Sequence, residues 1–176
     1  MQTTRQTTQA AAGTEIKPIA DEHRDWLNSK VQEVWKGRYV VSRGIAHEPA
    51  NLPGFIAFRN GVGVGIATYH IEGDECELVT LDALAQWKGF GTMLIEAVEE
   101  EARKQACSRM WMITTNDNID GLRFYQRRGY VISAVHPNAI DQSRKLKPSI
   151  PLVGCYGISI RDEIELEKYL WCWIGW

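Results

Sequence analysis

The chain has 176 residues and a formal net charge of −2 at neutral pH. This length favours one domain with a substantial core, and 44% hydrophobic with 24% charged residues is ordinary for a globular chain in water. The near-neutral charge provides no bulk attraction to nucleic acid or to an anionic membrane surface, so we expect neither as a partner.

The sequence contains no signal peptide and no apolar run near the roughly 20 residues that span a bilayer. The four cysteines lie far apart and lack the spacing of metal ligands: Cys76, Cys107, Cys155 and Cys172. We therefore expect free thiols, no bound metal and a cytoplasmic location.

The N-terminal part of the chain is predicted to begin with a tail, a strand and a helix. Residues 1–13 are rich in Gln, Thr and Ala and are interpreted as a flexible tail before a single domain over residues 14–176. A short strand is expected over Glu15–Ala20. Asp21 is a suitable N-cap for a helix whose apolar stripe ends at Trp35.

A hairpin and a further strand are predicted next. The mixed polarity of residues 39–53 predicts helix and loop. The strands Phe55–Phe58 and Val64–Ile71 flank Asn60-Gly61, which is a strong hairpin turn signal. A strand over Cys76–Leu84 follows after another turn.

The second half of the chain alternates between helices and strands. Five apolar residues at helical spacing follow Leu84: Met93, Leu94, Ala97, Val98 and Ala102. The next strand is Arg109–Thr115, and this strand–helix–strand order implies a parallel pair. A helix then ends at Gly129 as its C′ glycine, followed by a strand over Tyr130–His136, a long loop over residues 137–156 and a last strand over Ile158–Leu166.

These elements predict an α/β (α+β) fold, with a mixed, mostly antiparallel central sheet of about seven strands and helices on both faces. No internal repeat or second domain is found. The C-terminal segment Tyr169–Trp176 is too apolar to remain in water. It must pack on its own domain, on a partner chain such as the second copy of a homodimer, or in a substrate groove.

A glycine-bearing turn joins the strand that ends near Leu84 to the following helix. Its residues are Gln86, Trp87, Lys88, Gly89, Phe90, Gly91 and Thr92. A helix N-terminus offers free N–H groups and the positive end of the helix dipole, and glycines allow a phosphate to approach closely. The sequence lacks the P-loop pattern, and Leu94 replaces the third glycine of a dinucleotide fingerprint.

A second motif lies downstream of this turn, with the pattern Asn-x-x-Ala-x-x-Phe-Tyr-x-x-x-Gly-Phe/Tyr. It is matched by Asn118, Phe124, Tyr125, Gly129 and Tyr130, and Gly121 replaces the alanine. The first motif, Gln-x-x-Gly-x-Gly, and this second one together resemble the GNAT superfamily of acyl-CoA-dependent N-acetyltransferases. The resemblance is close over residues 76–130, and the predicted sheet agrees with that family's fold.

The resemblance implies a site for acetyl-CoA as cosubstrate. Backbone N–H groups from Lys88 to Thr92 would bind the pyrophosphate, and the backbone of Leu81, Asp82 and Ala83 would pair with the pantetheine arm. Asn118 would bond that arm, or cap the helix, or do both. Tyr125 would lie near the sulfur as an acid or an orienting group, or would only pack in the core.

The base that deprotonates the amine has several candidates. Glu75 and Glu77 are expected on one face of their strand together with Val79 and Leu81. The resemblance implies that a carboxylate on this strand serves as base in some family members, whereas others use a water chain. His70 is a further candidate, and each of these side chains could instead be structural.

The predicted activity is direct acetyl transfer to a primary amine, on a small molecule, a peptide or a protein. The alternative is a non-catalytic acyl-CoA sensor. Glu163, Glu165 and Glu167 form either an acidic face for a cationic acceptor or an ordinary solvent-facing strand. The loop over residues 137–156 is long enough to act as a lid. Arg127 and Arg128 either reach a CoA phosphate or lie at a solvated helix end.

Overall fold

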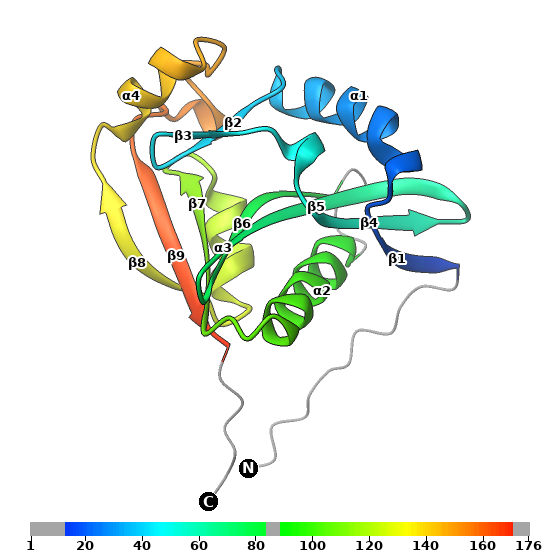
Figure 1. Ribbon diagram of the computed structural model, residues 1–176. Coiled ribbons are helices and arrows are strands. Elements are labelled where there is room, and N and C mark those ends of the chain that lie inside the picture. Colours follow the sequence, from blue (N-terminus) through cyan, green and yellow to red (C-terminus); the bar gives the residue numbers. More distant parts are fainter. Residues whose placement is uncertain (1–12, 84–88, 171–176) are drawn as a thin grey trace, which may run out of the picture.

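The computed structural model describes residues 13–83 and 89–170, and Figure 1 shows them around one seven-stranded sheet. The strand order is β1 (Thr14–Pro18), β4 (Gly54–Arg59), β5 (Val62–Glu72), β6 (Glu75–Asp82), β7 (Arg109–Thr115), β9 (Glu163–Tyr169) and β8 (Val131–His136). Each neighbouring pair is antiparallel except β6 and β7, which are parallel. The predicted fold class is confirmed.

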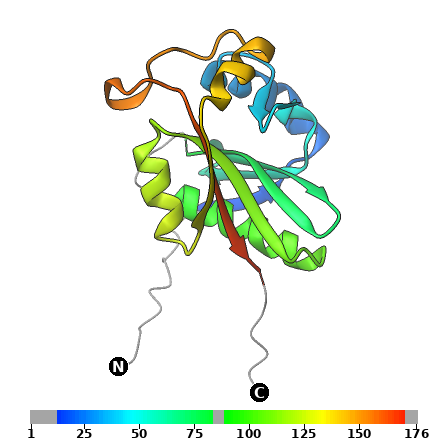
Figure 2. The ribbon, with the colours of Figure 1, turned by 90° about the vertical axis from the view of Figure 1, so that its left-hand side faces the viewer.

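Helices cover both faces of this sheet (Figures 1 and 2). They are α1 (Arg24–Trp35), α2 (Phe90–Lys104), α3 (Ile119–Gln126) and α4 (Ala139–Leu146), with short 3₁₀ turns at Asp21–His23, Pro49–Asn51 and Cys155–Gly157. None of the helices in the described ranges is long and apolar enough to cross a membrane. The tail predicted over residues 1–13 falls outside these ranges except for Gly13, as do residues 171–176 of the apolar C-terminal segment.

Two hydrophobic clusters hold the layers together. The larger one forms where the apolar stripe of α2, including Leu94 and Val98, packs on the sheet beside Met110 and Tyr130. The smaller one lies on the other face, where α1 packs Leu27 and Val31 against Ala50 and Ile66. The apolar spacing of α1 and α2 therefore predicts their packing faces correctly. Asp21 does not cap α1; it begins a 3₁₀ turn before the helix.

Residues 39–53 differ from the prediction of helix and loop. They form a hairpin of β2 (Val40–Ser42) and β3 (Ile45–His47) ahead of the 3₁₀ turn. Its two turn residues, Arg43 and Gly44, both have positive φ angles, of 49° and 75°. Asn or Gly usually occupies such positions. Because Arg43 occupies the first of them, the sequence does not show the usual hairpin signal.

Residues 137–156 were predicted as a loop but contain α4. Asn138 begins this helix with a φ of 60°, and its backbone N–H donates to the Asp162 carboxylate at 2.8 Å. Only Ile140 and Ser143 of α4 are buried, so its apolar stripe is too short to detect in the sequence. The last strand also begins later than predicted, at Glu163 instead of Ile158.

A β-bulge in β6 changes which side chains share a face. Tyr69 of β5 pairs with Leu78 of β6, but the next residue of β5, Thr68, pairs with Thr80. Val79 is therefore the extra, unpaired residue of the bulge. Leu81 therefore packs with Cys76 and Leu78 on the side of α2, and the prediction that it shares a face with Glu75 and Glu77 is wrong.

The parallel pairing of β6 and β7 is short. It joins Glu75–Glu77 to Arg109–Trp111 and then stops, although both strands continue. Beyond this point β7 pairs only with β9. The two strands thus separate toward their C-terminal ends, in the middle of the sheet.

Gly65 allows β5 to lie close to both α2 and β6. A Cβ atom there would lie 2.9 Å from Leu94 Cδ1 and 3.1 Å from the Asp82 carbonyl oxygen. We expect Gly65→Val to lower the free energy of unfolding by roughly 1–3 kcal/mol through overpacking. Thermal denaturation measures the effect, and Val62→Thr at an exposed position of the same strand is the control. Equal melting temperatures for the two variants would contradict this account of Gly65.

Candidate active site

A cavity of about 570 Å³ lies where β6 ends, between the N-terminus of α2 and the helix α3. Its walls include every described residue of the predicted acetyl-CoA set: Leu81, Asp82, Ala83, Gly89, Phe90, Gly91, Thr92, Asn118 and Tyr125. Gln86, Trp87 and Lys88 belong to the same prediction but lie outside the described residues. We call this space the cofactor groove.

The start of α2 leaves backbone donors available to the groove. Gly89 precedes the helix with a φ of 82°, and no side chain caps the helix there. The amides of Phe90, Gly91 and Thr92 belong to the first turn, where N–H groups lack intrahelical acceptors. A Cβ on Gly91 would lie 3.3 Å from the Phe124 ring, so glycine also allows α2 and α3 to approach each other.

Arg128 extends into this groove from the end of α3. Its guanidinium stacks 3.5 Å from the Phe124 ring centroid and donates hydrogen bonds to Thr92 Oγ1 and to the Phe124 carbonyl. Burial lowers the pKa of Arg128, and its Nε has no hydrogen-bond partner among the described residues. Arg128 is therefore a partly buried wall of the groove and not a solvated helix end; Arg123 and Arg127 line the groove as well.

Asn118 both caps α3 and lines the groove. Its Oδ1 accepts the Gly121 N–H at 3.0 Å, and its Nδ2 donates to Thr114 Oγ1 at 2.8 Å. A Cβ on Gly121 would overlap the Asn118 amide group. Glycine at position 121 therefore leaves room for the Asn118 amide group in the conformation that it adopts here.

Tyr125 stands between the groove and a second cavity. Its ring meets the Phe124 ring edge-on with 5.2 Å between centroids, and burial raises the pKa of its phenol to about 12. Arg128 opposes this increase, whereas Asp82 adds to it. The phenol therefore keeps its proton throughout the neutral pH range.

The second cavity, of about 280 Å³, lies in the space where β6 and β7 have separated. It shares Leu81, Asn118 and Tyr125 with the cofactor groove, so the two spaces meet at these side chains. Its other walls come from α1, β2, β6, β7, α4, the segment between α4 and β9, and the start of β9. We call it the acceptor cavity.

Glu75 and Glu77 line neither of these two cavities. Glu75 forms an ion pair with Arg109 at 3.1 Å. Glu77 is 5% exposed, and its Oε2 lies 3.4 Å from His47 Nε2 on the hairpin strand β3. Glu77 is also the last residue of β6 that pairs with β7, so it stands next to the opening between the strands.

The glutamates of β9 do not form a solvent-facing strand. Glu163 and Glu165 are 2% and 6% exposed, and Arg109 binds Glu165 at 2.6 Å and Glu167 at 2.7 Å. The alternation of charged and apolar residues predicted one wet face, but the β2–β3 hairpin lies near it, since Arg43 contacts both Glu163 and Glu165. Glu163 also lines the acceptor cavity.

Known proteins resemble this chain in sequence and in fold. Residues 18–130 match the family model described as acetyltransferase (GNAT) family. The chain is 39% identical to the uncharacterized protein YxbD of Bacillus subtilis over 157 residues, which is 88% of this chain and 98% of that protein. It is 48% identical to the uncharacterized protein YdhI of the same organism over 120 residues, or 68% and 75% of the two chains. The chain belongs to the GNAT acetyltransferase family.

The fold is similar to that of solved members of the family. A GNAT family acetyltransferase from Elizabethkingia anophelis, crystallised with acetyl-CoA bound, superimposes with a TM-score of 0.68. The match covers 90% of this chain and 99% of that protein at 17% sequence identity. At 17% identity the match shows a shared fold and nothing finer. The assignment of the site residues rests on the geometry of this structure.

Arg128 provides a test of the cofactor groove. We expect Arg128→Met, which keeps the length of the side chain, to weaken CoA binding about 10-fold, as loss of one charge-assisted hydrogen bond would. Calorimetry with CoA measures the change, and Arg103→Met on the exposed end of α2 is the matched control. If both variants bind CoA as the wild type does, Arg128 has a structural role only.

Proposed function

We propose that this protein transfers the acetyl group of acetyl-CoA to a primary amine by direct attack within a ternary complex. The observation that carries the proposal is that the cofactor groove and the acceptor cavity meet at Tyr125. Two substrates bound on either side would present their reacting atoms to each other at this junction. We place the reaction in the cytoplasm, which fits the free thiols of Cys76, Cys107 and Cys155.

The proposed reaction balances without an enzyme nucleophile. The ammonium first loses a proton to a base, and the neutral nitrogen attacks the thioester carbonyl. A C–N bond forms and the C–S bond breaks, while the nitrogen loses a second proton and the sulfur leaves with its electron pair. Backbone N–H groups near the bulge in β6, where Val79 interrupts the pairing, are suited to stabilise the carbonyl oxygen.

We propose that Tyr125 stabilises the departing sulfur mainly by donating a hydrogen bond. Its pKa of about 12 lies well above that of an ordinary thiol, which is about 8.5. Complete proton transfer from this phenol to the thiolate would therefore be unfavourable. The thiolate then takes up the second proton that the nitrogen releases.

We propose Glu77 as the base in preference to Glu75. The Glu75 carboxylate is occupied by Arg109, whereas Glu77 Oε1 is buried without a hydrogen-bond partner among the described residues. His47 beside it provides a route for the proton, and the His70 ring lies 5.8 Å from that of His47. Since Glu77 does not line the acceptor cavity, the proton would reach it through an intervening water.

A non-catalytic acyl-CoA sensor is the second candidate. Such a protein needs the cofactor groove but has no need for an adjoining acceptor cavity that contains a carboxylate. The presence of Glu163 in that cavity favours the enzyme.

The test is acetyl-CoA binding by calorimetry, followed by thiol release over a panel of small amines and peptides. We expect micromolar binding and turnover with at least one amine. Gly89→Asp should abolish binding, because its carboxylate would meet the pyrophosphate and its backbone would be strained at a φ of 82°. Binding without any turnover would favour the sensor, and no binding would refute the proposal.

Tyr125→Phe should lower kcat by about 10- to 100-fold, because it removes one hydrogen bond to the charge that develops on the sulfur. The affinity for acetyl-CoA should be almost unchanged. Because the raised pKa of Tyr125 keeps the phenol protonated up to about 12, the pH–rate profile should keep its shape while its amplitude falls. Steady-state kinetics from about pH 6 to 10 measures both effects. A lost alkaline limb in the variant would show instead that Tyr125 titrates during turnover.

A further inference from the structure

Glu163 is a buried carboxylate whose charge has no counterion among the described residues. It is 2% exposed, its Oε1 accepts the Ser143 hydroxyl at 2.7 Å and its Oε2 accepts the Arg43 backbone N–H at 3.3 Å. The other two glutamates of β9 differ, since Glu165 and Glu167 both form ion pairs with Arg109. The Arg43 guanidinium lies toward Glu165, at 3.8 Å, so it does not neutralise Glu163 either.

A buried carboxylate without a counterion destabilises the folded protein. Removing a charge from water is unfavourable, and two hydrogen bonds offset only part of that penalty. Glu163 lines the acceptor cavity together with Tyr125. A cation bound in this cavity would supply the missing charge.

The remaining walls of the acceptor cavity are mainly apolar. They include Trp35, Val40, Val41, Met112, Ile113, Ile140, Ile150 and Ile160. Such walls suit a hydrocarbon or aromatic body because they remove apolar surface from water, and the described lining contains no second carboxylate for another ammonium group.

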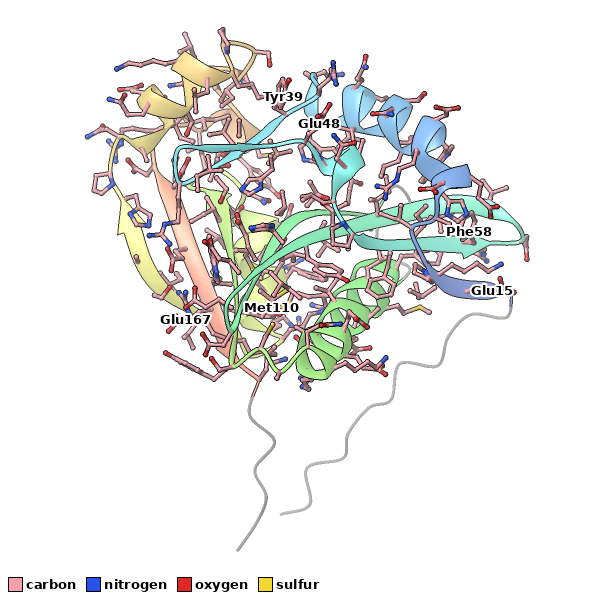
Figure 3. The ribbon with its side chains drawn as sticks, viewed as in Figure 1. Glu15, Tyr39, Glu48, Phe58, Met110 and Glu167 are labelled. Carbon is pink, nitrogen blue, oxygen red and sulfur yellow. The ribbon has the colours of Figure 1, made fainter. Side chains whose placement is uncertain are left out.

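Lys147 places a positive charge on the same cavity near the surface. Its Nζ donates to the carbonyl oxygens of Trp35 at 2.6 Å and Tyr39 at 2.7 Å, and burial lowers its pKa. Tyr39 is 45% exposed and lies just before β2, as labelled in Figure 3. A ligand with a second ammonium group would meet this lysine and be repelled.

We propose that the acceptor is a primary monoamine with an apolar body, and that Glu163 binds its ammonium group. Its body lies against Trp35 and the aliphatic walls, and Lys147 selects against polyamines and other polycations. The assignment rests on the proposed function for the fate of the amine, but the binding itself can be measured without acetyl transfer.

The experiment measures the binding of three probes to the protein saturated with CoA. CoA carries no acetyl group, so no transfer to the probe can occur. The probes are hexylamine, hexan-1-ol and 1,6-diaminohexane. We expect hexylamine to bind at least about 10-fold more tightly than either of the others, because a charge-assisted bond to Glu163 is stronger than a neutral one and the diamine meets Lys147.

Glu163→Gln keeps the acceptor for Ser143 and removes the charge, and it should reduce the preference for hexylamine over hexanol to less than about 3-fold. Glu167→Gln, at the opposite end of the same strand (Figure 3), is the matched control and should keep the wild-type preference. Lys147→Gln keeps a donor for the two carbonyl oxygens and should improve binding of the diamine. This third variant tests the cavity independently if Glu163→Gln does not fold.

The outcomes separate this inference from the proposed function. Wild-type protein that binds CoA but binds hexylamine no better than hexanol would overturn the inference and leave the enzyme proposal standing. Equal effects of Glu163→Gln and Glu167→Gln would overturn it too, since a general loss of negative charge would then explain both. Amine binding with the expected preference, but without thiol release when acetyl-CoA replaces CoA, would support the inference and count against the enzyme.

Discussion

The short parallel pairing of β6 and β7 is the constraint on which the rest of the site depends. Parallel strands need a crossover, and α2 supplies it, so the N-terminus of α2 must lie at the C-terminal end of β6. Because β7 leaves β6 after Trp111, the backbone of residues 78–82 has no strand partner on that side among the residues that the structure describes. Buried backbone groups require partners, and a bound arm with amide groups can provide them. One divergence therefore creates both the place for the cofactor and the space for its acceptor.

Arg109 keeps the other end of this opening closed. It lies in the first pair of the parallel ladder and bonds Glu75 of β6 as well as Glu165 and Glu167 of β9. A guanidinium has five donors in a fixed plane, so one side chain can join three strands where a lysine could not hold the same geometry. The strands are thus held together at the end of the sheet with the charged network and separate at the end with the cavities.

The sequence predicts those parts of the molecule in which local signals and tertiary packing agree. The stripe on α2, the Asn60-Gly61 hairpin and the succession of the seven sheet strands along the chain follow from periodicity and turn chemistry. The described members of the cofactor set also lie together as the two motifs indicate. The failures share a different cause, since they depend on contacts between distant segments. Nothing local to Arg43 indicates a hairpin, and nothing local to Glu163 indicates that α4 and the β2–β3 turn will contact it.

The two cavities also differ in the charge that they present. The cofactor groove has the N-terminus of α2 and three arginines of α3 and its end, Arg123, Arg127 and Arg128, which together suit a polyanion. The described lining of the groove also contains two carboxylates: burial raises the pKa of Asp82, and Asp120 pairs with Arg123 at 3.7 Å. Among the described residues, the acceptor cavity instead contains one carboxylate, that of Glu163, together with the ammonium group of Lys147 near the surface. CoA is anionic and an amine acceptor is cationic before it reacts, so in the proposed complex CoA would bind beside the three arginines and the ammonium group beside Glu163. In the proposed ternary complex, this separation would place the two substrates on either side of Tyr125 before any catalytic group acts.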